Sequence, residues 1–360
     1  MDCSILDYTL PEERIARFPA QKRDESKLLV FDRKTQKISH TIFKNLPDFL
    51  PCKYKMFRNN AAVLKARIFA KKDTGANVEC LLLTPQKDNI WTCMLRPAKR
   101  LKNGSIFFVE NAFSAKVLEH LENGNCIVDF ELSQGFSNVI EMAEAIGVVP
   151  LPPYIRRNQN SPDYDRTFDN NRYETVYADS SKRVAAAAPT AGLHFTDSLI
   201  ETLKNKGHNF YNLTLHVGIG TFQPLKTDRI EDHQMHGELY EIPTETLKAL
   251  TDKSLPSLAV GTTSLRAMED FTRKHIKADF NHKAPYIDSA NLFVYPPQKI
   301  HSADAMITNF HLPRSTLMCL VSTFLTPESA EGIDILKHIY NEAIINKYNF
   351  YSYGDAMLIL

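Results

Sequence analysis

The spacing of hydrophobic and polar residues divides the chain into two regions with different rhythms. Between about residues 66 and 135, short apolar segments recur at close intervals, separated by turn signals such as Asn103-Gly104 and Asn123-Gly124. The segments are 78–84, 90–95, 106–109, 115–118 and 127–130. Short strands joined by Asn-Gly turns are typical of antiparallel hairpins, so this region predicts a small antiparallel barrel or sandwich.

After residue 165 the rhythm changes to strand, loop and helix. Strand-like segments at 211–216, 258–260 and 305–308 each run into a loop of small and polar residues, and helical patterns follow the last two. If these strands share one edge of a parallel or mixed sheet, their loops converge where α/β proteins bind ligands. Further helical patterns occupy 139–146, 196–207 and 333–344.

Composition and charge exclude several classes of protein. The 360-residue chain is long for one core, its hydrophobic content is 43%, and it has no apolar run long enough to span a membrane. The N-terminus lacks the pattern of a secretion signal, and the six cysteines show neither CxxC nor zinc spacing. We therefore expect a reduced cytoplasmic protein. Because the net charge is +1, nucleic-acid binding must come from local patches.

Three basic segments are candidates for such patches. Lys99 and Arg100 lie on an expected loop between two strands. The proline-rich segment 150–157 presents Tyr154, Arg156 and Arg157, and is either a stiff linker or a surface that stacks a nucleobase and holds phosphates. Seven Lys or Arg and no acidic residue occur over 51–72, which we interpret as a solvated face rather than a phosphate contact.

The loop after the small-residue run 185–188 contains Thr190 and His194, just before a helix that Thr196 is expected to cap. It is either a tight turn with a satisfied core histidine or part of an anion site. The later loops offer comparable groups. Gly218, Gly220 and Thr221 form only a weak GxG signal, because no GxGxxG helix start follows. The other candidates are Thr262 and Thr263 in a turn that either caps a helix or binds an anion, Arg266 as an anion ligand or surface ion pair, and Asn309 and His311.

His233, His236 and Glu238 lie within six residues, and His216 precedes them on another loop. The three histidines could bind a metal, but their spacing is not HExxH. Acid–base catalysis is the alternative, because burial and neighbouring charges readily move imidazole and carboxyl pKa values.

A series of motifs runs in order along the whole chain. They are Asp-Tyr-x-Leu-Pro-Glu (7–12), Arg-Pro-Ala-Lys-Arg (96–100), Pro-Leu-Pro-Pro-Tyr-Ile-Arg-Arg (150–157), Ala-Ala-Pro-Thr-Ala-Gly-Leu-His-Phe-Thr (187–196), Thr-Leu-His-Val-Gly-Ile-Gly-Thr-Phe (214–222), His-x-Met-His-x-Glu (233–238), Val-Gly-Thr-Thr-Ser (260–264), Thr-Asn-Phe-His-Leu-Pro (308–313) and Ser-Tyr-Gly-Asp-Ala-Met-Leu-Ile-Leu (352–360). Together they resemble the S-adenosylmethionine:tRNA ribosyltransferase-isomerase family of queuosine biosynthesis.

The resemblance implies an α/β (multidomain α+β) fold. A larger α/β domain with a mixed sheet, residues 1–65 and 150–360, would be interrupted by a small antiparallel β-barrel domain at 66–149. The implied reaction transfers and isomerises the ribosyl part of S-adenosylmethionine onto 7-aminomethyl-7-deazaguanine at the tRNA wobble position. It yields epoxyqueuosine-tRNA, adenine and methionine. S-adenosylmethionine is consumed as a substrate, so no cofactor and no metal are expected. The expected partners are that substrate and the tRNA, with no membrane, and the protein is expected to be a monomer.

The resemblance also assigns roles to residues. His216, His236 and Glu238 are expected to be base and acid, while His194 and His311 position groups or donate protons. The expected substrate-binding residues are Thr190, Gly218, Gly220, Thr221, His233, Thr262, Thr263, Arg266 and Asn309. The expected tRNA-binding residues are Lys99, Arg100, Tyr154, Arg156 and Arg157.

The chain departs from the family pattern in two places. The family usually reads Asn-Asp-Thr-Arg-Val-x-Pro-Ala-Arg, whereas residues 59–67 here read Asn-Asn-Ala-Ala-Val-Leu-Lys-Ala-Arg. A carboxylate, a hydroxyl and a guanidinium are therefore missing. Gly237 also stands where the family has Ser. These changes leave a noncatalytic or weakly active tRNA-binding relative as one alternative. A metal-dependent hydrolase using His216, His233 and His236 is the other.

Overall fold

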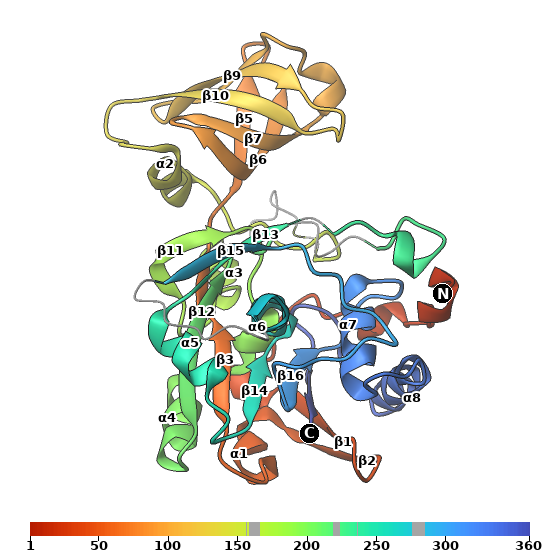
Figure 1. The fold of residues 1–360 in the computed structure, drawn as a ribbon. Coiled ribbons are helices and arrows are strands. Elements are labelled where there is room, and N and C mark those ends of the chain that lie inside the picture. Colours follow the sequence, from red (N-terminus) through yellow and green to blue (C-terminus); the bar gives the residue numbers. More distant parts are fainter. Residues whose placement is uncertain (156, 158–165, 219–223, 236, 276–284) are drawn as a thin grey trace.

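The chain forms two domains joined by a narrow neck (Figure 1). A computed structural model describes residues 1–155, 157, 166–218, 224–235, 237–275 and 285–360. The larger domain is built around a nine-stranded sheet, and the smaller one is a closed barrel. Within the described residues, no helix is both long and apolar enough to cross a membrane.

The sheet of the larger domain is mixed, as expected. Its central strands β12, β3, β14 and β16 are parallel, and the strands on either side add antiparallel pairs. The expected strands at 211–216, 258–260 and 305–308 are therefore confirmed, and they end at one edge. The strand order is β15 (Tyr286–Ala290), β13 (Glu238–Ile242), β12 (Asn209–Leu215), β3 (Lys55–Asn59), β14 (Ser257–Val260), β16 (Ala305–Asn309), β17 (Ala356–Ile359), β1 (Lys27–Asp32) and β2 (Lys37–Ile42).

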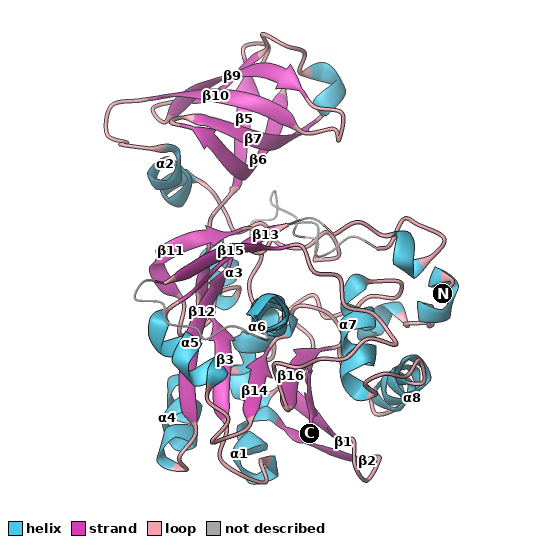
Figure 2. Cartoon of the chain, in the orientation of Figure 1, coloured by secondary structure: helices cyan, strands magenta, loops and turns pink. Residues whose placement is uncertain are grey.

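Helices cover both faces of this sheet (Figure 2). Successive residues of a strand point to opposite faces, so Met56 and Phe57 belong to two different apolar clusters. The cluster that contains Phe57 packs against α5 (Thr244–Thr251), α6 (Thr262–His275), α7 (Thr316–Leu325) and α8 (Gly332–Ile345). The cluster that contains Met56 packs against α1 (Leu46–Phe49) and α4 (Asp197–Asn205). A further helix, α3, spans Arg166–Arg172.

The caps of α4 follow the sequence pattern. The Thr196 side chain accepts a hydrogen bond from the Leu199 amide at 3.2 Å, which satisfies a free donor of the first turn. Gly207, just past the end of the helix, has a φ of +90°, a conformation that glycine adopts without steric cost.

The basic run at 51–72 is not a solvated face, and that interpretation was wrong. Part of the run forms β3, a central strand between β12 and β14. Lys55 is only 2% exposed, and its ammonium group donates to the Asp252 main-chain carbonyl. Arg58 lies over the rings of Tyr177 and Phe210, at 4.2 and 4.9 Å from their centroids. Long basic side chains can bury their aliphatic stems, which a count of charges does not show.

The smaller domain is a closed antiparallel barrel, which confirms the prediction from its short strands and turns. Its strand order is β10 (Cys126–Leu132), β7 (Ile90–Arg96), β6 (Asn77–Lys87), β5 (Arg67–Lys72), β8 (Ile106–Val109) and β9 (Phe113–His120). Closure leaves no free sheet edge. The helix α2 (Val139–Ile146) has the predicted limits, and its buried residues Val139, Met142 and Ala143 join the barrel core.

The neck consists of two chain segments that cross closely. One segment holds β4 (Ala61–Val63), which pairs in parallel with β11 (Asp179–Ala185). A Cβ atom on Gly147 would lie 2.0 Å from the Lys65 carbonyl oxygen, so only glycine fits where the segments pass. Arg67 and Val148 exchange main-chain hydrogen bonds of 3.1 and 2.9 Å. The domain boundaries at 65/66 and 149/150 stay predictions.

Candidate active site

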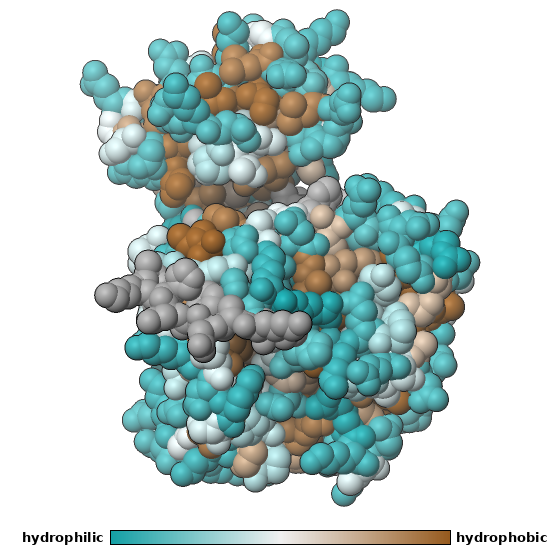
Figure 3. All heavy atoms as spheres, viewed as in Figure 1, coloured by the Kyte–Doolittle hydropathy of each residue, from teal (hydrophilic) through white to brown (hydrophobic). Residues whose placement is uncertain are grey.

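A cavity of about 720 Å³ lies between the two domains. Its volume falls in the range of about 300–1,000 Å³ that small-molecule sites occupy. Figure 3 shows apolar surface on the barrel and on the part of the larger domain that faces it. The barrel side contributes mainly apolar residues, and the polar groups come from the larger domain. The barrel residues are Leu83, Thr84, Pro85 and Trp91, and α2 adds Ile140.

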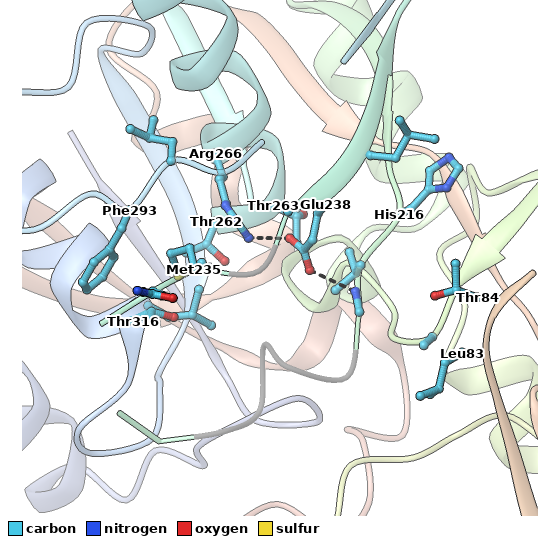
Figure 4. A pocket seen from close by; sticks show the side chains of 18 of the residues that line it. Leu83, Thr84, His216, Met235, Glu238, Thr262, Thr263, Arg266, Phe293 and Thr316 are labelled. Atoms are coloured by element: carbon cyan, nitrogen blue, oxygen red, sulfur yellow. Dashed lines mark hydrogen bonds and ion pairs between the residues drawn. The ribbon is translucent and has the colours of Figure 1, made fainter. Parts of the chain in front are cut away.

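A buried ion pair forms part of the polar wall of this cavity (Figure 4). Glu238 Oε2 lies 2.6 Å from Arg266 Nη1, and each side chain is nearly out of contact with solvent. Glu238 Oε1 accepts a hydrogen bond from the Gly218 amide at 2.9 Å, while Arg266 Nη2 donates to the Ala290 carbonyl at 2.8 Å. Arg266 therefore makes a buried ion pair rather than a surface one. The carboxylate is held in a fixed orientation from two sides.

Two of the expected histidines line the same cavity. His216 follows β12, and its amide donates to the Leu239 carbonyl at 2.9 Å, which fixes the backbone beside the cavity. Burial lowers the pKa of His216, with Glu241 opposing that shift and Lys182 adding to it. The imidazole is therefore neutral at pH 7 and can accept a proton. His233 contacts the Phe293 ring edge to face, with 5.3 Å between centroids.

The turn that begins α6 supplies hydroxyl groups to the cavity. Thr262 and Thr263 both line it, and they follow Gly261, which has a φ of +90°. Thr263 Oγ1 is buried and makes no hydrogen bond to any residue that the structure describes. A buried hydroxyl without a partner is costly, so this atom is well suited to a ligand.

A second, smaller cavity adjoins the first and shares Val217, Thr262, Thr263 and Leu317 with it. Its lining includes four more of the expected residues, Tyr154, Thr190, Asn309 and His311. His311 Nε2 lies 2.8 Å from Thr308 Oγ1, and burial lowers the His311 pKa to about 3. Asn309 Oδ1 is buried and unpaired among the described residues.

The structure places His194 away from the large cavity. Its ring lies 5.1 Å from the Phe43 ring, and its two nitrogens lie 2.7 Å from Ser26 Oγ and 3.2 Å from Asn309 Nδ2. Burial, reinforced by Arg23, lowers the His194 pKa to about 3. These contacts are those of a satisfied core histidine, whose link to the site runs through Asn309.

Of the expected tRNA-binding residues, the four that the structure describes are not gathered in one place. Lys99 and Arg100 are exposed on the 3-10 turn Ala98–Arg100 of the barrel. Tyr154 is half-buried against Tyr351, with 4.7 Å between ring centroids. Arg157 makes two hydrogen bonds to Asp169, of 2.7 and 3.0 Å, and its guanidinium stacks on Phe18. Arg157 is thus already engaged within the larger domain.

Four expected residues, Arg156, Gly220, Thr221 and His236, lie outside the described residues. Among those that are described, no group of three His, Cys, Asp or Glu side chains is placed to hold a metal ion.

Several residues of the cavity were not expected from the sequence. Leu83 and Trp91 look like ordinary strand residues, and only barrel closure and docking bring them to the site. Arg183 also lines the cavity. The run of small residues at 185–188, shortly after Arg183, was the only nearby sequence feature that suggested a site.

The residues at the departure from the family pattern lie beside the cavity but do not line it. Ala61 and Ala62 are at most 1% exposed, and both belong to β4 in the neck. Asn60 Oδ1 accepts a hydrogen bond from Thr214 Oγ1 at 2.7 Å. Leu64 is the nearest residue of this segment that reaches the cavity.

The fold is that of a two-domain α/β enzyme, with a large cavity between the domains. The family described as queuosine biosynthesis protein matches residues 3–359. The chain is 41% identical to the S-adenosylmethionine:tRNA ribosyltransferase-isomerases of Thermotoga maritima and Macrococcus caseolyticus, over 100% of each chain. The crystal structure of S-adenosylmethionine tRNA ribosyltransferase from Thermotoga maritima matches with a TM-score of 0.53 and 33% identity, covering 99% of this chain and 100% of that one. The chain belongs to the S-adenosylmethionine:tRNA ribosyltransferase-isomerase family of queuosine biosynthesis.

Proposed function

We propose that this protein transfers and isomerises the ribosyl part of S-adenosylmethionine onto 7-aminomethyl-7-deazaguanine at the wobble position of a tRNA. The products are epoxyqueuosine-tRNA, adenine and methionine. The observation that carries the proposal is the full-length match to the family, combined with an interdomain cavity whose wall holds Glu238, Arg266 and His216. The enzyme acts in the cytoplasm as a monomer, with S-adenosylmethionine and the precursor-bearing tRNA as partners.

The cavity residues suit the demands of this reaction. The sulfonium of S-adenosylmethionine acidifies the neighbouring C5′ protons, so a neutral imidazole such as His216 can remove one. Glu238, oriented by Arg266 and Gly218, can accept a hydrogen bond from a substrate amine or hydroxyl. The apolar wall from the barrel shields the reacting groups from water. The adenine also needs a proton as it leaves, and His236 is the candidate donor.

The other expected residues have supporting roles. Thr262 and Thr263 bind the methionine carboxylate, since the free Thr263 hydroxyl and the amides at the start of α6 are hydrogen-bond donors. Thr190, Asn309 and His311 shape the adjoining recess. His194 positions Asn309. Lys99 and Arg100 contact tRNA phosphates, because they are exposed cations on a chain of near-zero net charge.

Release of adenine from S-adenosylmethionine in the presence of the precursor-bearing tRNA tests the proposal. We expect adenine and methionine to be released in equal amounts, and only with the modified tRNA. Binding of both substrates without any release would identify a noncatalytic tRNA-binding relative instead.

A further inference from the structure

Arg183 occupies an unusual place, because its side chain contacts both domains and the cavity. The residue lies on β11 of the larger domain, and its side chain is 27% exposed. Its Nη1 atom lies 3.2 Å from Glu174 Oε1, 3.5 Å from Glu144 Oε2 and 3.2 Å from the Val63 carbonyl oxygen. Glu144 belongs to α2, the helix that packs on the barrel. One nitrogen of the guanidinium therefore ties the barrel unit to the larger domain.

The other donors of this guanidinium are available to a ligand. Arg183 Nε and Nη2 make no hydrogen bond to any residue within the described part of the chain, yet Arg183 lines the cavity. The two glutamates and the nearby Lys65, whose ammonium lies 3.6 Å from Glu144 Oε2, keep the cluster close to neutral and the guanidinium in place. A planar guanidinium fixed along one edge presents its other edge as a pair of parallel donors, which suits phosphate or carboxylate oxygens.

The charge of the cavity favours a phosphate. Among the described lining residues, Glu238 is the only carboxylate, and it is already paired with Arg266. The two other permanently charged groups are cations, Arg183 and the exposed Lys226, and Lys226 makes no ion pair with a described residue. Both side chains line the cavity and retain contact with solvent, so ligand groups that stay near the opening of the cavity can reach them. A nucleotide whose base enters the cavity leaves its flanking phosphates at that opening.

We infer that Arg183 binds a phosphate of the anticodon loop that flanks the wobble nucleotide, and that Glu174 and Glu144 hold its guanidinium in position for this contact. The inference rests on the proposed function for the identity of the RNA. It makes Arg183 a tRNA-positioning residue, distinct from the groups that contact S-adenosylmethionine. Lys226 adds a second, weaker contact at the same opening.

Direct binding of a precursor-bearing anticodon stem-loop to the full-length protein, without S-adenosylmethionine, tests this inference separately from turnover. Arg183→Gln should weaken binding by at least about 10-fold, the size expected for lost charge-assisted hydrogen bonds. It should also reduce the slope of log K against log salt by about 0.7, the value for one single-strand phosphate. Arg183→Lys keeps the charge but not the planar fork, so it should retain the salt slope and bind with intermediate affinity.

Glu144→Gln is the matched control, because it weakens the interdomain tie, while the closer contacts with Glu174 and the Val63 carbonyl still hold the guanidinium in position. We expect it to change stem-loop binding by less than about 3-fold. Equal losses in Arg183→Gln and Glu144→Gln would show that Arg183 is only a tie between domains, and would overturn the inference. A raised dissociation constant for S-adenosylmethionine with unchanged stem-loop binding would assign the guanidinium to the methionine carboxylate instead. If Arg183→Gln does not fold, stem-loop binding by Arg183→Lys is compared with that by Glu144→Gln. Equal losses would again overturn the inference, and a larger loss in Arg183→Lys would support it. Failure of wild-type turnover alone would leave these binding results unaffected.

Discussion

Glu238 and Arg266 come from different elements, the first residue of β13 and the second turn of α6, and their charged groups meet at 2.6 Å in the cavity wall. Burial lowers the pKa of Arg266, and the Glu238 carboxylate opposes that shift. Each charge therefore compensates the other, and neither side chain could be buried at low cost alone. The pair holds the Glu238 carboxylate in a fixed orientation in the cavity wall without leaving a buried charge uncompensated.

Removing the carboxylate should thus affect both folding and catalysis. Glu238→Gln leaves the Arg266 charge buried without its partner, at a cost of about 3–5 kcal/mol in the free energy of unfolding. We expect adenine release to fall by at least about 100-fold in protein that remains folded, the size typical of losing an acid–base group. Urea unfolding and single-turnover assays measure the two effects. Glu245→Gln, an exposed substitution on α5, is the control and should change neither. Full activity in Glu238→Gln would limit the ion pair to a structural role.

The first turn of α6 provides a sharper test, because one of its hydroxyls has no hydrogen-bond partner among the residues that the structure describes. Thr263→Val preserves shape and removes a buried hydroxyl that makes no hydrogen bond within the described residues, so stability should hold or rise. The KM for S-adenosylmethionine should rise about 10-fold, with a similar change in Thr262→Val.

Ser264→Ala is the control for this turn. Ser264 Oγ already donates to the Val260 carbonyl at 2.8 Å, so its loss should lower the melting temperature and leave the KM unchanged. An unchanged KM in both threonine variants would place the methionine carboxylate elsewhere.

Local patterns predicted the elements well, because they depend on residues close in sequence. The limits of α2, the Thr196 cap and five of the six barrel strands follow from periodicity and turn residues, whereas β5 (Arg67–Lys72) was not predicted. The composition of the site could not be predicted in the same way. His194 and His216 lie in equally suggestive motifs, yet one is a core residue beside Phe43 and the other lines the cavity. Which of them reaches the cavity depends on strand order and on how the barrel docks.

The charge of a segment was also a poor guide to its exposure. Lys55 and Arg58 belong to the most central part of the sheet, where cation–π contacts and a main-chain carbonyl replace water. The role of Arg183 was not predicted at all, since two of its three partners, Val63 and Glu144, are distant along the chain.

Two buried histidines should make the protein sensitive to acid. The pKa of His194 and that of His311 are each about 3, below the value of about 6.5 for an unfolded histidine. Between these values the unfolded state binds more protons, so stability rises with pH across this window and is lost as pH falls through it. Each histidine contributes a loss of up to about 1.4 kcal/mol per pH unit below 6.5.

Urea unfolding at several pH values from 7.5 to 4.5 measures this slope. His311→Gln, which no longer titrates, should flatten it, although the substitution also lowers stability at pH 7. His338→Gln, on the exposed side of α8, is the control for the histidine-to-glutamine change itself. A slope that His311→Gln does not alter would mean that the imidazole is protonated in the folded protein.

The basic turn of the barrel should contribute to tRNA affinity without affecting S-adenosylmethionine. Replacing Lys99 and Arg100 with Ala removes two exposed cations, so tRNA binding should weaken and its salt dependence flatten, because fewer counterions are released. Filter binding at several salt concentrations measures both. Lys34 and Lys37, exposed around the turn between β1 and β2 at the end of the larger domain away from the barrel, form the matched control pair (Figure 1). Equal effects of the two pairs would indicate nonspecific attraction.

The segment 60–62, which departs from the family pattern, supports a last prediction. Its residues are buried, so restoring the side chains of the family pattern should destabilise the protein. Restoring that pattern means Asn60→Asp, Ala61→Thr and Ala62→Arg. Ala62 is fully buried in β4, and its register partner on β11 is Arg183. A guanidinium placed there would be buried next to a second cation, in a core that has no space for it. We expect the triple variant to lose at least about 3 kcal/mol of stability and to gain no activity.

Asn60→Asp alone is the milder variant, because an aspartate can still accept the Thr214 hydroxyl. Adding Arg183→Ala to the triple variant should recover part of the lost stability, since it removes the facing cation and opens space. Melting temperature and kcat/KM, measured on all three variants, show whether the family side chains would reach the cavity or would compete with Arg183 for space. A triple variant that keeps its melting temperature and gains about 10-fold in kcat/KM would mean that these side chains reach the cavity and that this protein works below the capacity of its family. Loss of stability relieved by Arg183→Ala would instead mean that Arg183 occupies the space near the neck that the family gives to the arginine at position 62.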